Sequence, residues 1–171
     1  PALEAAPPGA YDESERRKVS IGEVGIMETK AAILEQYDAK RDLYEKFGQE
    51  IKHQLENILR EEELVYNLIS SRLKERDKLS EKIDRKRGKY AQLEDITDIA
   101  GVRVITYYIA DVNKVAEIVE QEFAVDRENS IDKSAALEPD RFGYCSVHYV
   151  VEMSPERLKL RGYKAYAGLK C

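Results

Sequence analysis

The sequence contains no tryptophan and only two cysteines and two histidines among its 171 residues. The cysteines, Cys145 and Cys171, have neither metal-ligand spacing nor the density of a secreted disulfide framework, so we interpret both as ordinary thiols. No apolar run reaches the length of a membrane span, and nothing near the first residue resembles a signal peptide. We therefore expect a cytoplasmic globular protein without a membrane segment.

Two sequence motifs that commonly bind phosphate are also absent. The chain has neither a GxxxxGK(S/T) loop nor a GxGxxG loop, so a nucleoside triphosphate would have to be held by cationic side chains. The net charge is −5, yet residues 72–89 contain nine basic residues and only four acidic ones. A cationic segment in an acidic protein favours a discrete anionic ligand over broad binding to nucleic acid.

The composition divides the chain into three segments. Residues 1–20 are rich in Pro, Ala and charge without periodicity, which predicts a disordered tail or linker. Residues 21–63 carry apolar side chains at steps of three, four or seven, which predicts one long helix or two in succession. These side chains are Ile33, Tyr37, Tyr44, Phe47, Ile51, Leu55 and Ile58. Residues 64–171 form the expected core domain.

Strand and helix patterns alternate within this core. The predicted strands are 64–74, 102–109, 123–126 and 146–153. The predicted helices are 75–87 and 111–122. The second strand is nearly all apolar, as expected for a strand covered on both faces, and Asp111 is the expected N-cap of the second helix. Residues 156–171 end with the pattern of an entry to another strand. Helices around a mixed sheet indicate an α+β or α/β fold.

The cationic segment keeps its charge on one side while its periodicity changes from strand to helix. Arg72 and Lys74 share one face of the predicted strand, and four further cations share one face of the following helix. These are Lys78, Lys82, Arg85 and Lys89. Like charges one turn apart disfavour an isolated helix by about a few tenths of a kcal/mol each, and a bound anion would explain them. The alternative is a solvated helix face on which Glu81 and Asp84 offset part of the charge.

Two further segments place polar residues at strand ends. Asp98 stands just before a predicted buried strand, where a carboxylate can hold Mg²⁺, and Arg103 lies just inside that strand. The alternative for Asp98 is a cap or a turn former. Tyr144 and His148 share one face of a strand, where they could offer a ring to a base and a donor to a phosphate. An aromatic core face would give the same pattern.

In this order, the segments resemble the synthetase domain of the RelA/SpoT family, as found in the small alarmone synthetases. The first family motif is matched by Arg72, Lys74, Lys82 and Arg85, with Lys78 where the family has a serine. Residues 98–103 match D-x-x-G-x-R, and residues 143–148 match G-Y-x-S-(L/V)-H. The resemblance covers about residues 64–153. It implies a nucleotidyltransferase-like fold of the α+β class, a mixed sheet flanked by helices.

The resemblance also implies a pyrophosphokinase that moves the β,γ-diphosphate of ATP to the 3′-hydroxyl of GDP or GTP, making an alarmone such as (p)ppGpp. Arg72 and Arg103 would sandwich the adenine, and Asp98 would ligate Mg²⁺ as the catalytic carboxylate. The residues implied in binding the rest of ATP are Lys74, Lys78, Lys82 and Arg85. The residues implied in binding the acceptor are Arg141, Tyr144 and His148.

Two departures from the family affect these expectations. Asp140 and Phe142 replace the lysine and asparagine of guanosine-specific members, so an adenosine nucleotide or a tRNA 3′ end is an alternative acceptor. The family's second metal carboxylate would follow Cys171. We therefore expect a fragment incomplete at its C-terminus, with weak turnover, or an inactive nucleotide-binding module.

The resemblance extends to partners and to one absent activity. Two histidines are too few for the hydrolase metal centre of the large family members. Homo-oligomers and a neutralising antitoxin partner, as in toxic members of the family, are further expectations.

Overall fold

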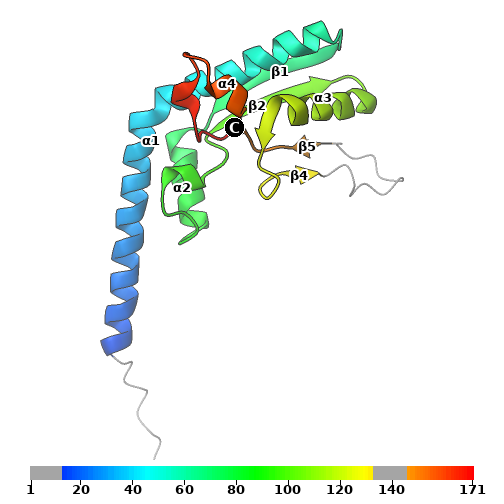
Figure 1. The fold of residues 1–171 in the computed structure, drawn as a ribbon. Coiled ribbons are helices and arrows are strands. Elements are labelled where there is room, and N and C mark those ends of the chain that lie inside the picture. Colours follow the sequence, from blue (N-terminus) through cyan, green and yellow to red (C-terminus); the bar gives the residue numbers. More distant parts are fainter. Residues whose placement is uncertain (1–12, 133–145) are drawn as a thin grey trace, which may run out of the picture.

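A single long helix, α1 (Glu13–Glu61), supports the rest of the chain in the computed structural model, which describes residues 13–132 and 146–171 (Figure 1). The apolar stripe predicted on this helix is confirmed, because Tyr37 and Phe47 are almost fully buried. The predicted disordered tail is wrong for residues 13–20, which form the first turns of α1. Glu, Arg and Lys dominate these turns, and they extend an existing helix at little cost. No helix within the described ranges is both long and apolar enough to pass through a membrane.

Strands β1 (Tyr66–Leu73) and β2 (Ala100–Thr106) form an antiparallel pair that packs against the C-terminal half of α1 (Figure 1). Gly48 of α1 allows the close approach, since a Cβ atom there would lie 3.4 Å from the Cβ of Ala100. Side chains alternate along each strand, so the next residue, Gly101, lies on the opposite face of the pair.

The strand predicted at 102–109 therefore differs from the structure in two ways. It is covered by α1 on one face only, and it ends at Thr106. The aromatic residues after it, Tyr107 and Tyr108, are exposed. A strand that is covered on both faces and a strand that leads into an exposed turn can both have an apolar sequence. Only the tertiary packing distinguishes the two cases.

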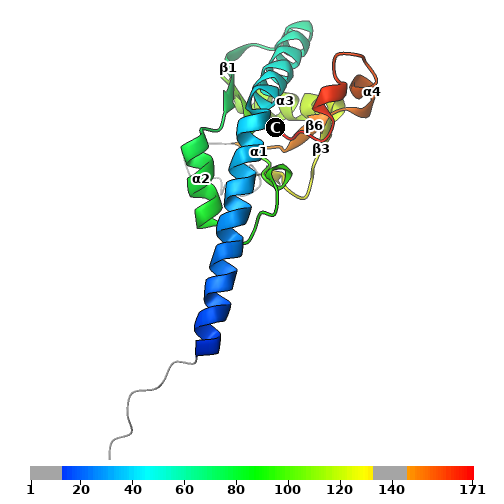
Figure 2. The same ribbon diagram turned by 90° about the vertical axis from the view of Figure 1, so that its left-hand side faces the viewer.

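Helix α2 (Arg76–Arg85) lies beside the middle of α1, and Figure 2 shows the two helices next to each other. Leu79 and Ile83 of α2 are buried in the core. Two ion pairs join the helices, Arg76 to Asp38 at 3.0 Å and Lys30 to Asp84 at 2.7 Å. Apolar burial and ion pairing thus fix α2 along α1, in agreement with the helix predicted at 75–87.

Short elements make up the remainder of the described chain. They are η1 (Leu93–Asp95), α3 (Ile109–Glu122), β3 (Phe123–Val125), β4 (Ile131–Asp132), β5 (Val147–His148), β6 (Val151–Met153), α4 (Pro155–Leu158) and η3 (Lys164–Tyr166). Strand β3 pairs with β6, and β4 pairs with β5. The α+β class is confirmed, although every strand pair among the described residues is antiparallel, so no mixed sheet is observed there.

Local predictions in this region needed correction at two points. The strand predicted at 146–153 is divided into β5 and β6, because the backbone of Val150 bonds to the Ser130 hydroxyl and the Asp126 N–H instead of a strand partner. Asp111 is not the N-cap of α3, since that helix begins at Ile109 and Asp111 lies in its first turn. A carboxylate there still favours the helix through the dipole.

The C-terminal segment crosses α1 on the side away from β1 and β2. The ring of Tyr166 packs on Phe47 with centroids 5.5 Å apart, and the Tyr163 hydroxyl donates to Glu50 at 2.9 Å. Cys171 then exchanges two backbone hydrogen bonds with Val151, both 2.9 Å long. This pairing agrees with the strand entry predicted at the end of 156–171.

Candidate functional site

Arg72 and Arg103 lie on the face of the β1–β2 pair that α1 leaves uncovered. Arg72 is opposite Gly101 and Arg103 is opposite Ser70, so the two arginines are diagonal neighbours on one face. The side chain of Arg72 passes over Gly101, where an added Cβ would lie 3.6 Å from Arg72 Nε. Both arginines are exposed, and neither forms an ion pair with another described residue. Strand pairing therefore places two exposed guanidinium groups on one surface, and their contact with a base stays a prediction.

Asp98 forms the centre of a three-residue cluster with Lys74 and Lys82. The Nζ atom of Lys82 lies 2.6 Å from Asp98 Oδ1, and that of Lys74 lies 3.1 Å from Oδ2. Lys74 follows β1, Lys82 comes from α2 and Asp98 precedes β2, so three separate segments meet here. Both lysine side chains are 17% exposed and the aspartate is 44% exposed, which leaves the carboxylate accessible from solvent.

The lysines keep Asp98 ionised. Burial by itself would raise the pKa of this carboxyl group, but hydrogen bonds from Lys82 and Lys74 outweigh burial and lower the pKa below its ordinary value. Two ammonium groups and one carboxylate give the cluster a net positive charge at neutral pH. The cluster can therefore attract an anion and still present a carboxylate to a cation.

The two other cations of the first motif are positioned differently. Lys78 lies one turn before Lys82 on α2 and is paired with Glu81 at 2.9 Å on the exposed surface. Arg85 is exposed at the end of α2 and forms no ion pair with any residue that the structure describes. Of the predicted phosphate-binding set, Lys74 and Lys82 are thus gathered at Asp98, whereas Lys78 is held by a local partner.

Tyr90 is a part of this site that the sequence reasoning missed. Its ring centroid lies 5.8 Å from Lys82 Nζ and 5.7 Å from Lys89 Nζ, within the range of cation–π attraction. The side chain is only 9% exposed, so a buried aromatic ring lies beside Lys82. The sequence signal that could have identified it is its position immediately after a run of cationic residues.

Only one of the three predicted acceptor residues lies within the part of the chain that the structure describes. Arg141 and Tyr144 lie outside the described residues, so their predicted roles are not tested. His148 belongs to β5, pairs with Ile131 of β4 and is exposed. An exposed imidazole could meet a ligand, but no described contact joins His148 to the Asp98 cluster.

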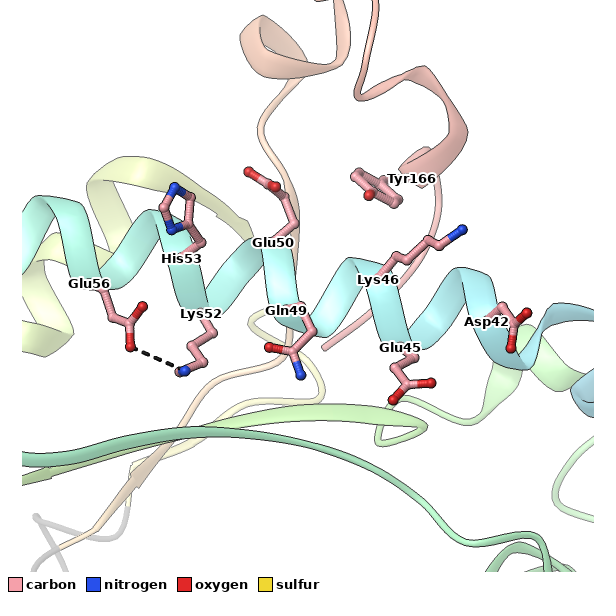
Figure 3. Close-up of a pocket in the computed structure, with 9 residues that line it drawn as sticks. All are labelled: Asp42, Glu45, Lys46, Gln49, Glu50, Lys52, His53, Glu56 and Tyr166. Carbon is pink, nitrogen blue, oxygen red and sulfur yellow. Dashed lines mark ion pairs between the residues drawn. The ribbon is translucent and has the colours of Figure 1, made fainter.

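A separate hollow of about 700 Å³ runs along α1, and Figure 3 shows the side chains around it. Tyr166 from the C-terminal segment borders it, together with four carboxylates and two lysines of α1. These charged residues are Asp42, Glu45, Glu50, Glu56, Lys46 and Lys52. None of the residues of the Asp98 cluster borders it. Because carboxylates outnumber lysines in its lining, the hollow is unfavourable for an anionic ligand, and we do not assign the nucleotide to it.

The Asp98 cluster offers a divalent cation one carboxylate ligand. The described residues contain no group of three or more His, Cys, Asp or Glu side chains that could hold a metal by themselves. Mg²⁺, however, is usually bound by one or two carboxylates together with substrate phosphates. Asp98 beside two lysines would therefore fit a metal ion that is also bound by the phosphates of a nucleotide.

The Asp98 cluster thus gathers a cation that follows β1 and a cation of α2 around one carboxylate of an α+β domain. The chain belongs to the RelA/SpoT family, because the family model described as "Region found in RelA / SpoT proteins" matches residues 71–161. This match contains Arg72, Lys74, Lys82, Asp98 and Arg103. A search of curated protein sequences found no match.

Solved structures of small alarmone synthetases are similar to the chain. Small alarmone synthetase 2 from Bacillus subtilis is 26% identical with a TM-score of 0.56, over 68% of this chain and 61% of that protein. A GTP pyrophosphokinase family protein from Streptococcus pneumoniae is 28% identical with a TM-score of 0.56, over 69% and 60%. Small alarmone synthetase 1 from Bacillus subtilis, bound to its product pppGpp, is 25% identical with a TM-score of 0.56, over 70% and 64%. The chain thus spans less than two thirds of each relative.

Proposed function

We propose that this protein is a pyrophosphokinase that transfers the β,γ-diphosphate of ATP to the 3′-hydroxyl of a nucleotide. The observation that carries the proposal is the contact of Asp98 with Lys82 at 2.6 Å and with Lys74 at 3.1 Å. This cluster lies within the segment shared with the RelA/SpoT family. A carboxylate between two ammonium groups suits a magnesium-bound triphosphate. When it binds, Mg²⁺ would replace the lysines as the partner of the carboxylate, and phosphate oxygens would replace the carboxylate as the partner of the lysines.

The donor would lie across the uncovered face of β1 and β2. Neither Arg72 nor Arg103 forms an ion pair there with any other residue that the structure describes, and a guanidinium plane stacks well on an aromatic base. The triphosphate would then reach Lys74 and Lys82, with Arg85 supplying a further charge from α2. In the reaction, the acceptor 3′-oxygen bonds to the β-phosphorus and the bond from that phosphorus to the α,β-bridging oxygen breaks. AMP leaves with the bridging oxygen, and the hydroxyl proton is released.

The cations act mainly by neutralising charge. Charge grows on the transferred group and on the leaving AMP, and fixed ammonium groups stabilise it without rearranging during the reaction. Asp98 would hold Mg²⁺ against the phosphates, and that ion would supply further neutralisation and alignment. The lowered pKa of Asp98 keeps this ligand ionised at neutral pH.

We infer a guanosine nucleotide, GDP or GTP, as the acceptor. The support is that small alarmone synthetase 1 is known bound to its product pppGpp and is 25% identical to this chain. Arg141, Tyr144 and His148 are the residues proposed to receive it. An adenosine nucleotide and a tRNA 3′ end remain alternatives, because Asp140 and Phe142 replace the lysine and asparagine of guanosine-specific members.

A nucleotide-binding module without turnover is the second candidate function. Asp98 is the only carboxylate in contact with the two lysines among the described residues. One carboxylate is the minimum for a Mg²⁺ ion that is bound jointly by the protein and by substrate phosphates. Such a module would bind ATP and Mg²⁺ but would not release AMP.

One assay separates these possibilities. The protein is incubated with Mg²⁺, labelled ATP and, in separate reactions, GDP, GTP, ADP or tRNA, and AMP and the pyrophosphorylated product are quantified. AMP formed together with a 3′-pyrophosphorylated nucleotide supports the pyrophosphokinase and identifies its acceptor. ATP binding without AMP in any reaction supports the module. Absence of both binding and turnover would refute the proposed function.

A further inference from the structure

Tyr37 connects the supporting helix α1 to the Asp98 cluster. Its side chain is 1% exposed, and its hydroxyl donates to the backbone carbonyl oxygen of Lys74 at 2.6 Å. The tyrosine is separated from this partner by 37 positions in the sequence. The contact therefore depends on how α1 packs against the end of β1, and the sequence pattern of Tyr37 showed only a core position.

The bonded carbonyl belongs to the residue whose side chain reaches Asp98. The N–H of Lys74 donates to the carbonyl oxygen of Ile99 at 2.8 Å, and its Nζ lies 3.1 Å from Asp98. The paired residues of β1 and β2 end at Leu73 and Ala100, so Lys74 lies just beyond the strand pair. Its N–H is fixed by Ile99, the residue that precedes β2, and its carbonyl is fixed by Tyr37. Together these two bonds set the orientation of the peptide from which the ammonium group extends.

The hydroxyl of Tyr37 is a permanent donor. Burial raises the pKa of this phenol, and the nearby Arg41 guanidinium offsets only part of that effect. The group therefore stays protonated across the physiological pH range and keeps its bond to Lys74 there.

We propose that Tyr37 is a positioning residue, which holds the Lys74 ammonium group at the place where it meets Asp98 and the phosphates of the donor. This inference rests on the proposed function, because it assigns Tyr37 a role in binding ATP through Lys74. The tyrosine does not touch the ligand. Its effect is to reduce the number of backbone orientations available to Lys74 before ATP arrives.

The test replaces one hydroxyl and has a matched control on the same helix. Tyr37→Phe keeps the buried ring and removes the bond to Lys74, together with the hydrogen bond between the Tyr37 hydroxyl and Arg41. Tyr44→Phe removes the hydroxyl of a second α1 tyrosine, 2% exposed, that makes no hydrogen bond to any described residue. Binding of Mg²⁺ with an ATP analogue that has an α,β-methylene bridge is measured by calorimetry, because this bridge blocks the transfer step.

We expect Tyr37→Phe to weaken analogue binding about three- to tenfold, the range for one lost hydrogen bond. Tyr44→Phe should stay within about twofold of the wild-type protein. AMP has fewer phosphates for Lys74, and its affinity should change less than that of the analogue in Tyr37→Phe. A general loss of structure would lower both affinities together.

A double-mutant cycle tests whether Tyr37 acts through Lys74. In a Lys74→Ala background, Tyr37→Phe should change analogue affinity by less than about twofold, because the positioned ammonium group is gone. The same loss in both backgrounds, or equal effects of Tyr37→Phe and Tyr44→Phe, would overturn the positioning role alone. Unchanged affinity in Lys74→Ala itself would overturn both this inference and the role proposed for the cluster.

Discussion

Replacing Lys82 with alanine is the most direct perturbation of the proposed donor site. Its Nζ atom lies 2.6 Å from Asp98, and its side chain is 17% exposed. A charge-assisted hydrogen bond from such a group to a phosphate contributes about 1.5 to 3 kcal/mol. At about 1.4 kcal/mol for each factor of ten, Lys82→Ala should weaken ATP binding about tenfold to hundredfold.

The cost to folding should be much smaller than the cost to binding. Asp98 is 44% exposed, so water can replace the lost ammonium group, and Lys74 remains beside the carboxylate. Ion pairs of this exposure contribute about 1 kcal/mol or less to stability. Urea unfolding of Lys82→Ala should therefore give a free energy close to that of the wild-type protein.

The assay is calorimetric titration with Mg²⁺ and the α,β-methylene analogue of ATP at two salt concentrations. Lys114→Ala is the control, because Lys114 is an exposed lysine of α3 paired with Asp111, and its loss changes the net charge equally. Binding should weaken in Lys82→Ala and remain within about twofold of wild type in Lys114→Ala. Unchanged affinity in both Lys82→Ala and Arg85→Ala would refute the reasoning, since α2 would then have no part in holding phosphate.

Three further predictions concern Asp98. Asp98→Asn should lower Mg²⁺-dependent AMP formation by orders of magnitude in any form of the protein that turns over, and turnover equal to wild type would contradict its assignment as a metal ligand. Mn²⁺ should bind weakly to the free protein and tightly with the methylene analogue, as followed by electron paramagnetic resonance, because the lysines occupy the carboxylate until phosphates replace it. Tight binding of Mn²⁺ alone would show a site that we have not recognised. The lowered pKa of Asp98 contributes stability above its unfolded pKa, near 4, which is lost as the pH falls through the lower folded value. Urea unfolding between pH 5 and pH 3 should thus show a smaller acid loss in Asp98→Asn than in wild type, and equal losses would be inconsistent with this ion pairing.

The predictions that the structure confirmed came from local periodic patterns. The stripe on α1, the strand before Lys74 and the helix that follows it are each determined within about ten residues, where hydrophobic period and charge spacing act directly. Predictions failed where a neighbour in space made the decision. Residues 13–20 are helical because they continue a helix anchored further along, and Asp111 is not a cap because Tyr108 already occupies that position.

The sequence by itself determined which chemical groups this protein carries and in what order, including Arg72, Lys74, Lys82 and Asp98 as parts of one recognisable motif set. The tertiary structure alone decided which of them meet. Lys82 contacts Asp98 because Leu79 and Ile83 bury their side of α2 against the core, which brings the adjoining flank of the helix, where Lys82 lies, to the segment before β2. The bond from Tyr37 to Lys74 joins positions far apart in the chain, and no local pattern records such a contact, because it depends on the packing of α1 against the end of β1.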